Sequence, residues 1–123
     1  MKNPDDNFLI GRLRSLKFAL RGALLLITTE HSIMVQFFIA IIVTVLGFIM
    51  QISAIEWMFQ FLAIGLVLVA ESLNTGIEKL SDFVHPAYNK KIGFIKDISA
   101  GAATFAAIIA IIIGLIIYIP KFS

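Results

Sequence analysis

Long uncharged stretches separate short charged segments along this chain. No charged residue lies between Glu30 and Glu56. At about 1.5 Å per residue, the run 33–55 is long enough to cross a hydrocarbon core of roughly 30 Å. Two more apolar runs follow at 57–80 and 98–120, and the first of these two contains acidic residues. The pattern predicts three transmembrane helices.

A different periodicity precedes the first apolar run. Between residues 8 and 27, leucines recur every three or four positions and share one arc of a helix. Arg14, Lys17 and Arg21 lie beside that arc. This arrangement predicts an amphipathic helix on the membrane surface, with its cations toward anionic headgroups. A simple juxtamembrane anchor with no part in chemistry is the alternative interpretation.

Composition narrows the class of protein. Of 123 residues, 59% are hydrophobic and 15% are charged. So small a soluble monomer could not bury that much apolar surface. The absence of cysteine excludes disulfides, thiolate metal ligands and a thiol nucleophile. A net charge of +2 gives no reason to expect nucleic acid as a partner. We therefore expect a single all-α membrane domain over residues 1–123.

The basic residues predict the orientation in the membrane. Nine of the ten lysines and arginines lie before the first span or between 79 and 97, and Lys121 is the exception. Because positive loops stay in the cytoplasm, we expect the N-terminus and the segment 79–97, which contains the loop Asp82–Ile95, on the inner side of the cell membrane. Three crossings then leave the C-terminus outside.

A polar stripe occupies the inner end of the second span. Glu71, Asn74, Glu78 and Asp82 follow one another at helical spacing, so they share one face. Ionisable groups at membrane depth are costly and indicate function. Hydrogen bonding between helices is the structural alternative, because polar side chains also hold membrane helices together.

The other two spans bring polar groups to the same depth. Glu30 precedes the first span, and Lys96 and Asp97 precede the third. Carboxylates gathered this closely repel one another unless a cation intervenes. Mg²⁺ suits oxygen ligands, and it commonly binds one or two carboxylates together with substrate phosphates. Alternatively, Lys96 and Asp97 only mark the start of a helix.

This arrangement predicts phosphoryl transfer from ATP to a lipid hydroxyl. Glu30 and Glu78 would hold Mg²⁺ and the ATP phosphates, Lys96 would neutralise phosphate charge, and Glu71 would act as general base. The chain has no Walker A or glycine-rich kinase loop. A small oligomeric transporter of cations or protons is the alternative outside this class.

Several other polar and small residues have predicted structural roles. His31 and His85 are expected to be structural, and Gln36 and Gln51 to form hydrogen bonds between helices. The third span carries a strip of small residues that permits close helix packing, either between protomers of a homo-oligomer or within one protomer. This strip consists of Ala102, Ala106, Ala110 and Gly114, with Ala103 and Ala107 beside it.

The wording of the acidic segment also resembles a known family. The segment GLVLVAESLNTGIEKLSDFV, followed by KDISAGA, is similar to the signature of the prokaryotic integral-membrane diacylglycerol kinases. The resemblance extends from Arg12 to Pro120. It implies a homotrimer whose protomers each have three spans and a surface helix, composite active sites at subunit boundaries, and MgATP as donor.

The resemblance also implies roles for individual residues. Glu71 corresponds to the catalytic base, and Glu30 and Glu78 to acids linked to magnesium. Asn74 matches another active-site position, while Lys96 and Asp97 match positions that touch the nucleotide. Phe18 stands where relatives often carry an aromatic residue near the nucleotide. The loop residues that would approach ATP are Tyr88 and Asn89. Met34 departs from the pattern, because many members have a basic residue there.

The family contains two kinds of acceptor. Diacylglycerol, which would give phosphatidic acid, is the acceptor expected at the level of the family. Undecaprenol is the alternative, because the segments NTGIEK and GLIIYIPK are more similar to that branch. Both lipids present a hydroxyl at the same interface, so the carboxylates do not distinguish them.

Overall fold

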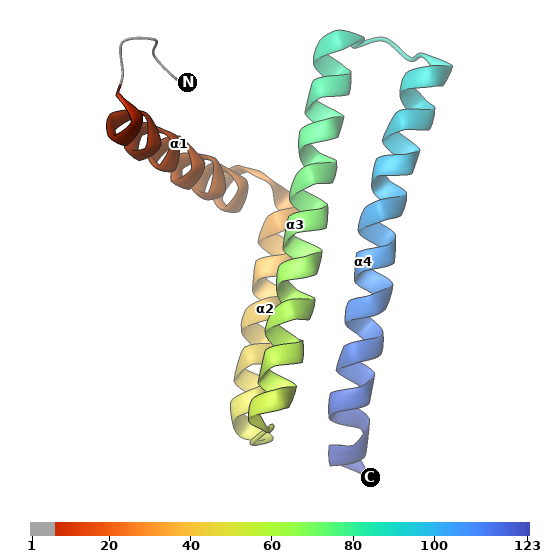
Figure 1. Ribbon diagram of the computed structural model, residues 1–123. Helices are drawn as coiled ribbons and strands as arrows, with labels where there is room; N and C mark the ends of the chain where they lie inside the picture. The colour runs from red at the N-terminus through yellow and green to blue at the C-terminus, as the bar shows by residue number, and fades with distance from the viewer. Residues whose placement is uncertain (1–6) are drawn as a thin grey trace.

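The computed structural model describes residues 7–123, which form four α-helices. They are α1 (Phe8–Thr29), α2 (His31–Ile49), α3 (Ala54–Val84) and α4 (Lys90–Phe122). Three of them, α2 to α4, run side by side, while α1 projects from the bundle at an angle (Figure 1). The predicted all-α architecture is confirmed. Lys2, which contributes to the predicted orientation, lies outside the described residues.

The helices α2, α3 and α4 are each long and apolar enough to cross a membrane, as the sequence predicts. Most of their large apolar side chains face outward from the single chain, as Phe61 and Phe105 do. A helix that is apolar around its whole circumference needs lipid or other protein around it. The fold is therefore that of a membrane protein.

The first span is shorter than predicted. Helix α2 ends at Ile49, so the predicted end at residue 55 is wrong. Gln51 adopts a left-handed backbone conformation with φ of 51°. Helix α3 then begins with a capping box, in which Ser53 and Glu56 each accept a hydrogen bond from the other's backbone N–H. A tight turn therefore interrupts an uncharged run of sequence.

The predicted loop Asp82–Ile95 is also wrong in extent. Helix α3 continues to Val84, and α4 already begins at Lys90, which leaves residues 85–89 as the connection. The Asn89 side chain caps α4 by accepting hydrogen bonds from the backbone N–H groups of Lys91 and Ile92. Lys96 and Asp97 consequently lie on the helix itself, on the side of the bundle where α3 ends.

Polar contacts near both ends of the helices show how α3 and α4 pack against each other. Near one end, Lys96 forms an ion pair with Asp82; near the other, the Tyr118 hydroxyl donates to Gln60. As many residues separate Gln60 from Asp82 as separate Lys96 from Tyr118. The two helices therefore run antiparallel in one register, which places Glu71 at the level of Ala107.

The buried amide between the helices belongs to Gln60. Its Nε2 donates to the Val43 carbonyl of α2 at 3.1 Å, and its Oε1 accepts from Tyr118 of α4 at 2.5 Å. These bonds satisfy a side chain that is buried where water is scarce and connect all three helices. The side-chain amides of Gln36 and Gln51 make no hydrogen bond with any residue in 7–123, so the prediction for those two residues is wrong for the single chain.

Part of the small-residue strip packs within the chain. Ala103 and Ala106 of α4 are buried, whereas Ala102 is exposed. Short side chains let helix backbones approach closely, and here α3 is the main neighbour of α4. The strip thus has a role inside one protomer, and the oligomer stays a prediction.

The turn between α2 and α3 depends on Gly47. A Cβ atom at this position would lie 2.8 Å from the ring of Trp57 and 3.1 Å from Ile52. We expect Gly47→Ala to destabilise the protein by about 1–3 kcal/mol, because both neighbours would have to shift. Thermal unfolding in detergent measures the effect. Gly65→Ala is the matched control, since its Cβ meets nothing within 4 Å; an equal loss in both variants would contradict the packing argument.

Candidate active site

Helix α3 carries the polar stripe at the end that leads into the α3–α4 loop. Glu71, Asn74 and Glu78 are half-buried on it, and Asp82 is exposed one turn further on. The carboxylate of Glu71 makes no hydrogen bond or ion pair with any described residue. A half-buried carboxylate without a partner is available for a ligand or for a proton from a substrate.

Glu30 reaches this stripe from the junction of α1 and α2. Its backbone N–H donates to Leu26 at the end of α1, and its carbonyl accepts from Met34 in α2, so the residue is held between the two helices. Its carboxylate lies 2.9 Å from the ammonium of Lys79 on α3. Because Lys79 follows Glu78 directly, the structure brings Glu30 beside the stripe as the sequence analysis proposes.

Helix α4 approaches the stripe through Lys96. The Lys96 ammonium donates to Asp82 at 2.7 Å. Asp97, the next residue, is exposed and makes no contact of this kind with the described chain. One chain therefore joins Lys96 to the stripe but leaves Asp97 and Glu71 apart from these ion pairs.

Two buried polar atoms near this end lack a hydrogen-bond partner among the described residues. They are Oδ1 of Asn74 on α3 and Oγ of Ser99 on α4. A buried polar group without a partner is costly, so such atoms indicate a missing internal water or a ligand that enters the bundle. Asn74 is a predicted site residue. Ser99 is missed by the sequence analysis, although a serine one turn after Lys96 in an apolar helix is a visible signal.

The carboxylates of this site fit a magnesium ion only if phosphates or waters complete its coordination. Residues 7–123 contain no group of three His, Asp or Glu side chains placed to hold a metal. Mg²⁺ commonly takes only one or two protein carboxylates, with phosphates and waters as its remaining ligands. Glu30 and Glu78 supply oxygen ligands of the right type for that kind of site.

The α3–α4 loop forms a small polar hollow beside the Lys96–Asp82 pair. Its volume is about 100 Å³, and His85, Tyr88 and Asn89 are among its lining residues. Tyr88 is exposed, and the side-chain oxygen of Asn89 is already used to cap α4. The ring of His85 forms a hydrogen bond with the Ala87 carbonyl, which supports its predicted structural role.

Phe18 lies on α1, away from these contacts. Phe18 is 37% exposed, and its ring stacks on no other aromatic ring among the described residues. The single chain therefore gives Phe18 no place in the candidate site.

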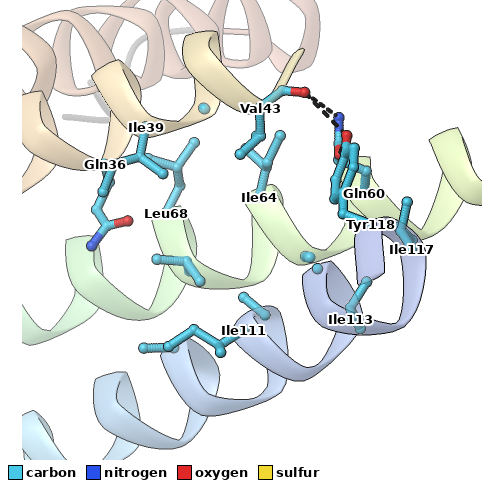
Figure 2. Close-up of a pocket in the computed structure, with 16 residues that line it drawn as sticks. Gln36, Ile39, Val43, Gln60, Ile64, Leu68, Ile111, Ile113, Ile117 and Tyr118 are labelled. Carbon is cyan, nitrogen blue, oxygen red and sulfur yellow. Dashed lines mark hydrogen bonds between the residues drawn. The ribbon is translucent and has the colours of Figure 1, made fainter. Parts of the chain in front are cut away.

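A second, larger cavity lies deeper between α2, α3 and α4. It has a volume of about 340 Å³ and a lining that is almost entirely apolar (Figure 2). The hydrogen bonds of Gln60 and Tyr118 to Val43 lie at one end, and Gln36 lies toward the other. Leu68 and Ala107 also line it. Leu68 is one turn from Glu71, so the apolar cavity extends to the depth of that carboxylate.

Comparison with known proteins gives matches that extend over most of the chain. The family model for prokaryotic diacylglycerol kinase matches residues 17–118. The undecaprenol kinase of Bacillus subtilis (strain 168) is 39% identical over 93 residues, which is 76% of each chain. The diacylglycerol kinase of Synechocystis sp. is 29% identical over 109 residues, which is 88% of this chain and 62% of that protein.

These matches include every helix that contributes to the candidate site. They agree with the resemblance carried by the acidic stripe and with the three candidate spans. The chain belongs to the prokaryotic diacylglycerol kinase family, and it is a membrane-embedded kinase that acts on lipid alcohols.

Proposed function

We propose that this enzyme transfers the γ-phosphate of ATP to the hydroxyl of undecaprenol. The observation that favours this acceptor is the 39% identity to the Bacillus subtilis protein, a value higher than the 29% identity to the Synechocystis protein. Diacylglycerol is the second candidate, because the matched family and the Synechocystis relative carry its name.

The reaction needs a group that accepts the proton of the lipid hydroxyl. Glu71 is half-buried, has no partner among the described residues, and lies at the depth of the apolar cavity. As the lipid oxygen forms its bond to the γ-phosphorus, its proton passes to the Glu71 carboxylate. The bond from the γ-phosphorus to the bridging oxygen breaks, and ADP leaves with that oxygen.

The nucleotide is held by the groups at the loop end of the bundle. Glu30 and Glu78 are the carboxylates that would hold Mg²⁺, and the metal supplies neutralisation of charge on the phosphates. Lys96 can turn from Asp82 to a phosphate oxygen, since both partners are accessible to solvent. Asn74 is proposed as a further catalytic-site residue on the family resemblance, and its buried Oδ1 has no partner among the described residues. Asp97, Tyr88, Asn89 and Phe18 are proposed nucleotide contacts on the family resemblance.

The apolar cavity supports a lipid as acceptor. A hydroxyl beside Glu71 would leave the attached hydrocarbon chain at the depth of Leu68 and Ala107, which line that cavity. Hydrocarbon gains stability in an apolar lining, so the chain would hold the alcohol at the carboxylate. A transporter of cations would need polar groups along a whole crossing, and this lining is apolar over most of its length.

The site as it stands in one chain also supports a homo-oligomer. Among the described residues, no three His, Asp or Glu side chains are placed to hold a metal, and the exposed side chain of Asp97 forms no ion pair. A neighbouring copy would supply the missing groups at a site between protomers, and a trimer is the form that the resemblance implies. We place this site and the N-terminus in the cytoplasm, where ATP is available, because basic residues concentrate at that end.

A panel of lipid alcohols tests the acceptor. Purified enzyme is given γ-labelled ATP, Mg²⁺ and either undecaprenol or diacylglycerol in matched micelles. We expect labelled undecaprenyl phosphate to form with a kcat/KM at least tenfold above that for diacylglycerol. A preference for diacylglycerol would establish the second candidate instead. Labelling of neither lipid would contradict the proposed function as a whole.

A further inference from the structure

Lys79 forms an ion pair with Glu30, which is one of the two proposed metal ligands. Lys79 is not one of the predicted site residues, yet its ammonium is 2.9 Å from the Glu30 carboxylate. The charges of Glu78 and Asp82 are also close enough to act on it. This lysine therefore lies among three acidic side chains at the end of the bundle where the nucleotide is proposed to bind.

The two side chains of this ion pair differ in how firmly they are held in place. Backbone hydrogen bonds to α1 and α2 hold Glu30, whose side chain is 22% exposed. The Lys79 side chain is 67% exposed and reaches Glu30 from the opposing helix. A long, solvated lysine can leave an ion pair at low cost, because an exposed pair changes an equilibrium by about fivefold or less. The carboxylate stays in place, while the ammonium can be displaced.

We propose that Lys79 is the resident counter-ion of Glu30 and competes with the divalent cation for that carboxylate. This inference rests on the proposed function, because it takes Glu30 as an acid linked to the metal. Without metal, the ammonium neutralises Glu30 and limits its repulsion from Glu78. When a divalent cation binds Glu30, the lysine withdraws toward solvent. Lys79 is thus a positioning residue that sets how tightly the site takes metal.

Replacement of Lys79 by glutamine tests this competition. Mn²⁺ alone is titrated into the full-length protein in detergent micelles, and free Mn²⁺ is measured by its electron paramagnetic resonance signal. We expect Lys79→Gln to bind Mn²⁺ about three- to fivefold more tightly than the parent. That ratio corresponds to the contribution of one exposed ion pair. Lys79→Arg should bind Mn²⁺ like the parent, because arginine keeps the competing charge.

Lys91→Gln is the matched control. It removes one positive charge near the same end, and the Lys91 side chain is exposed and forms no ion pair in the described chain. Equal tightening in Lys91→Gln and Lys79→Gln would overturn the inference, because it would show a general effect of charge. Saturable binding by the parent with no change in Lys79→Gln would overturn it as well, while leaving the proposed metal site intact. No saturable binding by the parent would also overturn the inference, because Glu30 would then take no metal for which Lys79 could compete; the nucleotide-completed site is tested separately by the magnesium titrations of activity. Thermal unfolding of each variant without metal verifies that all are folded.

Discussion

Glu71→Gln is expected to lower kcat by about 100- to 10,000-fold, the range that a general base contributes. Glutamine has nearly the same shape as glutamate, but it cannot accept the proton of the lipid hydroxyl. Because the Glu71 carboxylate makes no hydrogen bond or ion pair with the described residues, its replacement should not disturb the fold. Steady-state transfer of labelled phosphate to lipid measures kcat, and the binding of a non-hydrolysable ATP analogue should stay close to that of the parent.

Glu56→Gln is the control for this change on the same helix. Glu56 lies at the other end of α3, where it completes the capping box and pairs with Lys121 at 3.1 Å. Its replacement should affect stability slightly and leave kcat unchanged. Equal activity in Glu71→Gln and the parent would exclude Glu71 as the base. A large loss in both variants would point to a structural cause in α3.

Glu78→Gln is expected to raise the Mg²⁺ concentration for half-maximal activity at least about tenfold. Loss of a supporting residue around a metal commonly weakens affinity by about 10- to 100-fold, and a direct carboxylate ligand should matter at least as much. Activity is titrated with Mg²⁺ at a fixed, saturating concentration of lipid. High Mg²⁺ should restore part of the lost rate, because the metal can still bind through Glu30 and the phosphates.

The response of Glu78→Gln to metal separates ligation from base catalysis. Glu71→Gln should keep the parent's dependence on Mg²⁺ while turning over slowly, whereas Glu78→Gln should shift that dependence. A Glu78→Gln variant whose magnesium titration overlays that of the parent would exclude Glu78 as a ligand.

Hydropathy predicts the number of crossings well, but it predicts helix ends less well. The turn at 50–53 contains no glycine or proline, so hydropathy alone extends the first span to residue 55. The segment from Ser53 to Glu56 has the spacing of a capping box, which marks the boundary in the sequence. The loop after α3 is overestimated because Pro86 and Gly93 are residue types typical of loops, although Gly93 lies within α4.

Helical spacing also predicts which side chains share a face, and the stripe on α3 follows from it. Contacts between helices need more information, because the axial register and rotation of each helix decide them. The sequence therefore proposes Gln36 and Gln51 as interhelical amides, while Gln60 has the partners. It also places Glu30 near α3 but does not identify Lys79 as its partner. Ser99 is missed for the same reason.

The position of the metal–nucleotide site is the central claim, and paramagnetic relaxation measures it directly. The chain has no cysteine, so Lys90→Cys and Ile55→Cys each create a single site for a nitroxide label. Both residues are exposed, and they lie at opposite ends of the bundle. We predict that Mn²⁺ with a non-hydrolysable ATP analogue strongly broadens the label at residue 90 and leaves the label at residue 55 almost unchanged. Strong broadening at residue 55, or equal broadening at both, would contradict a site built from Glu30, Glu78 and Lys96.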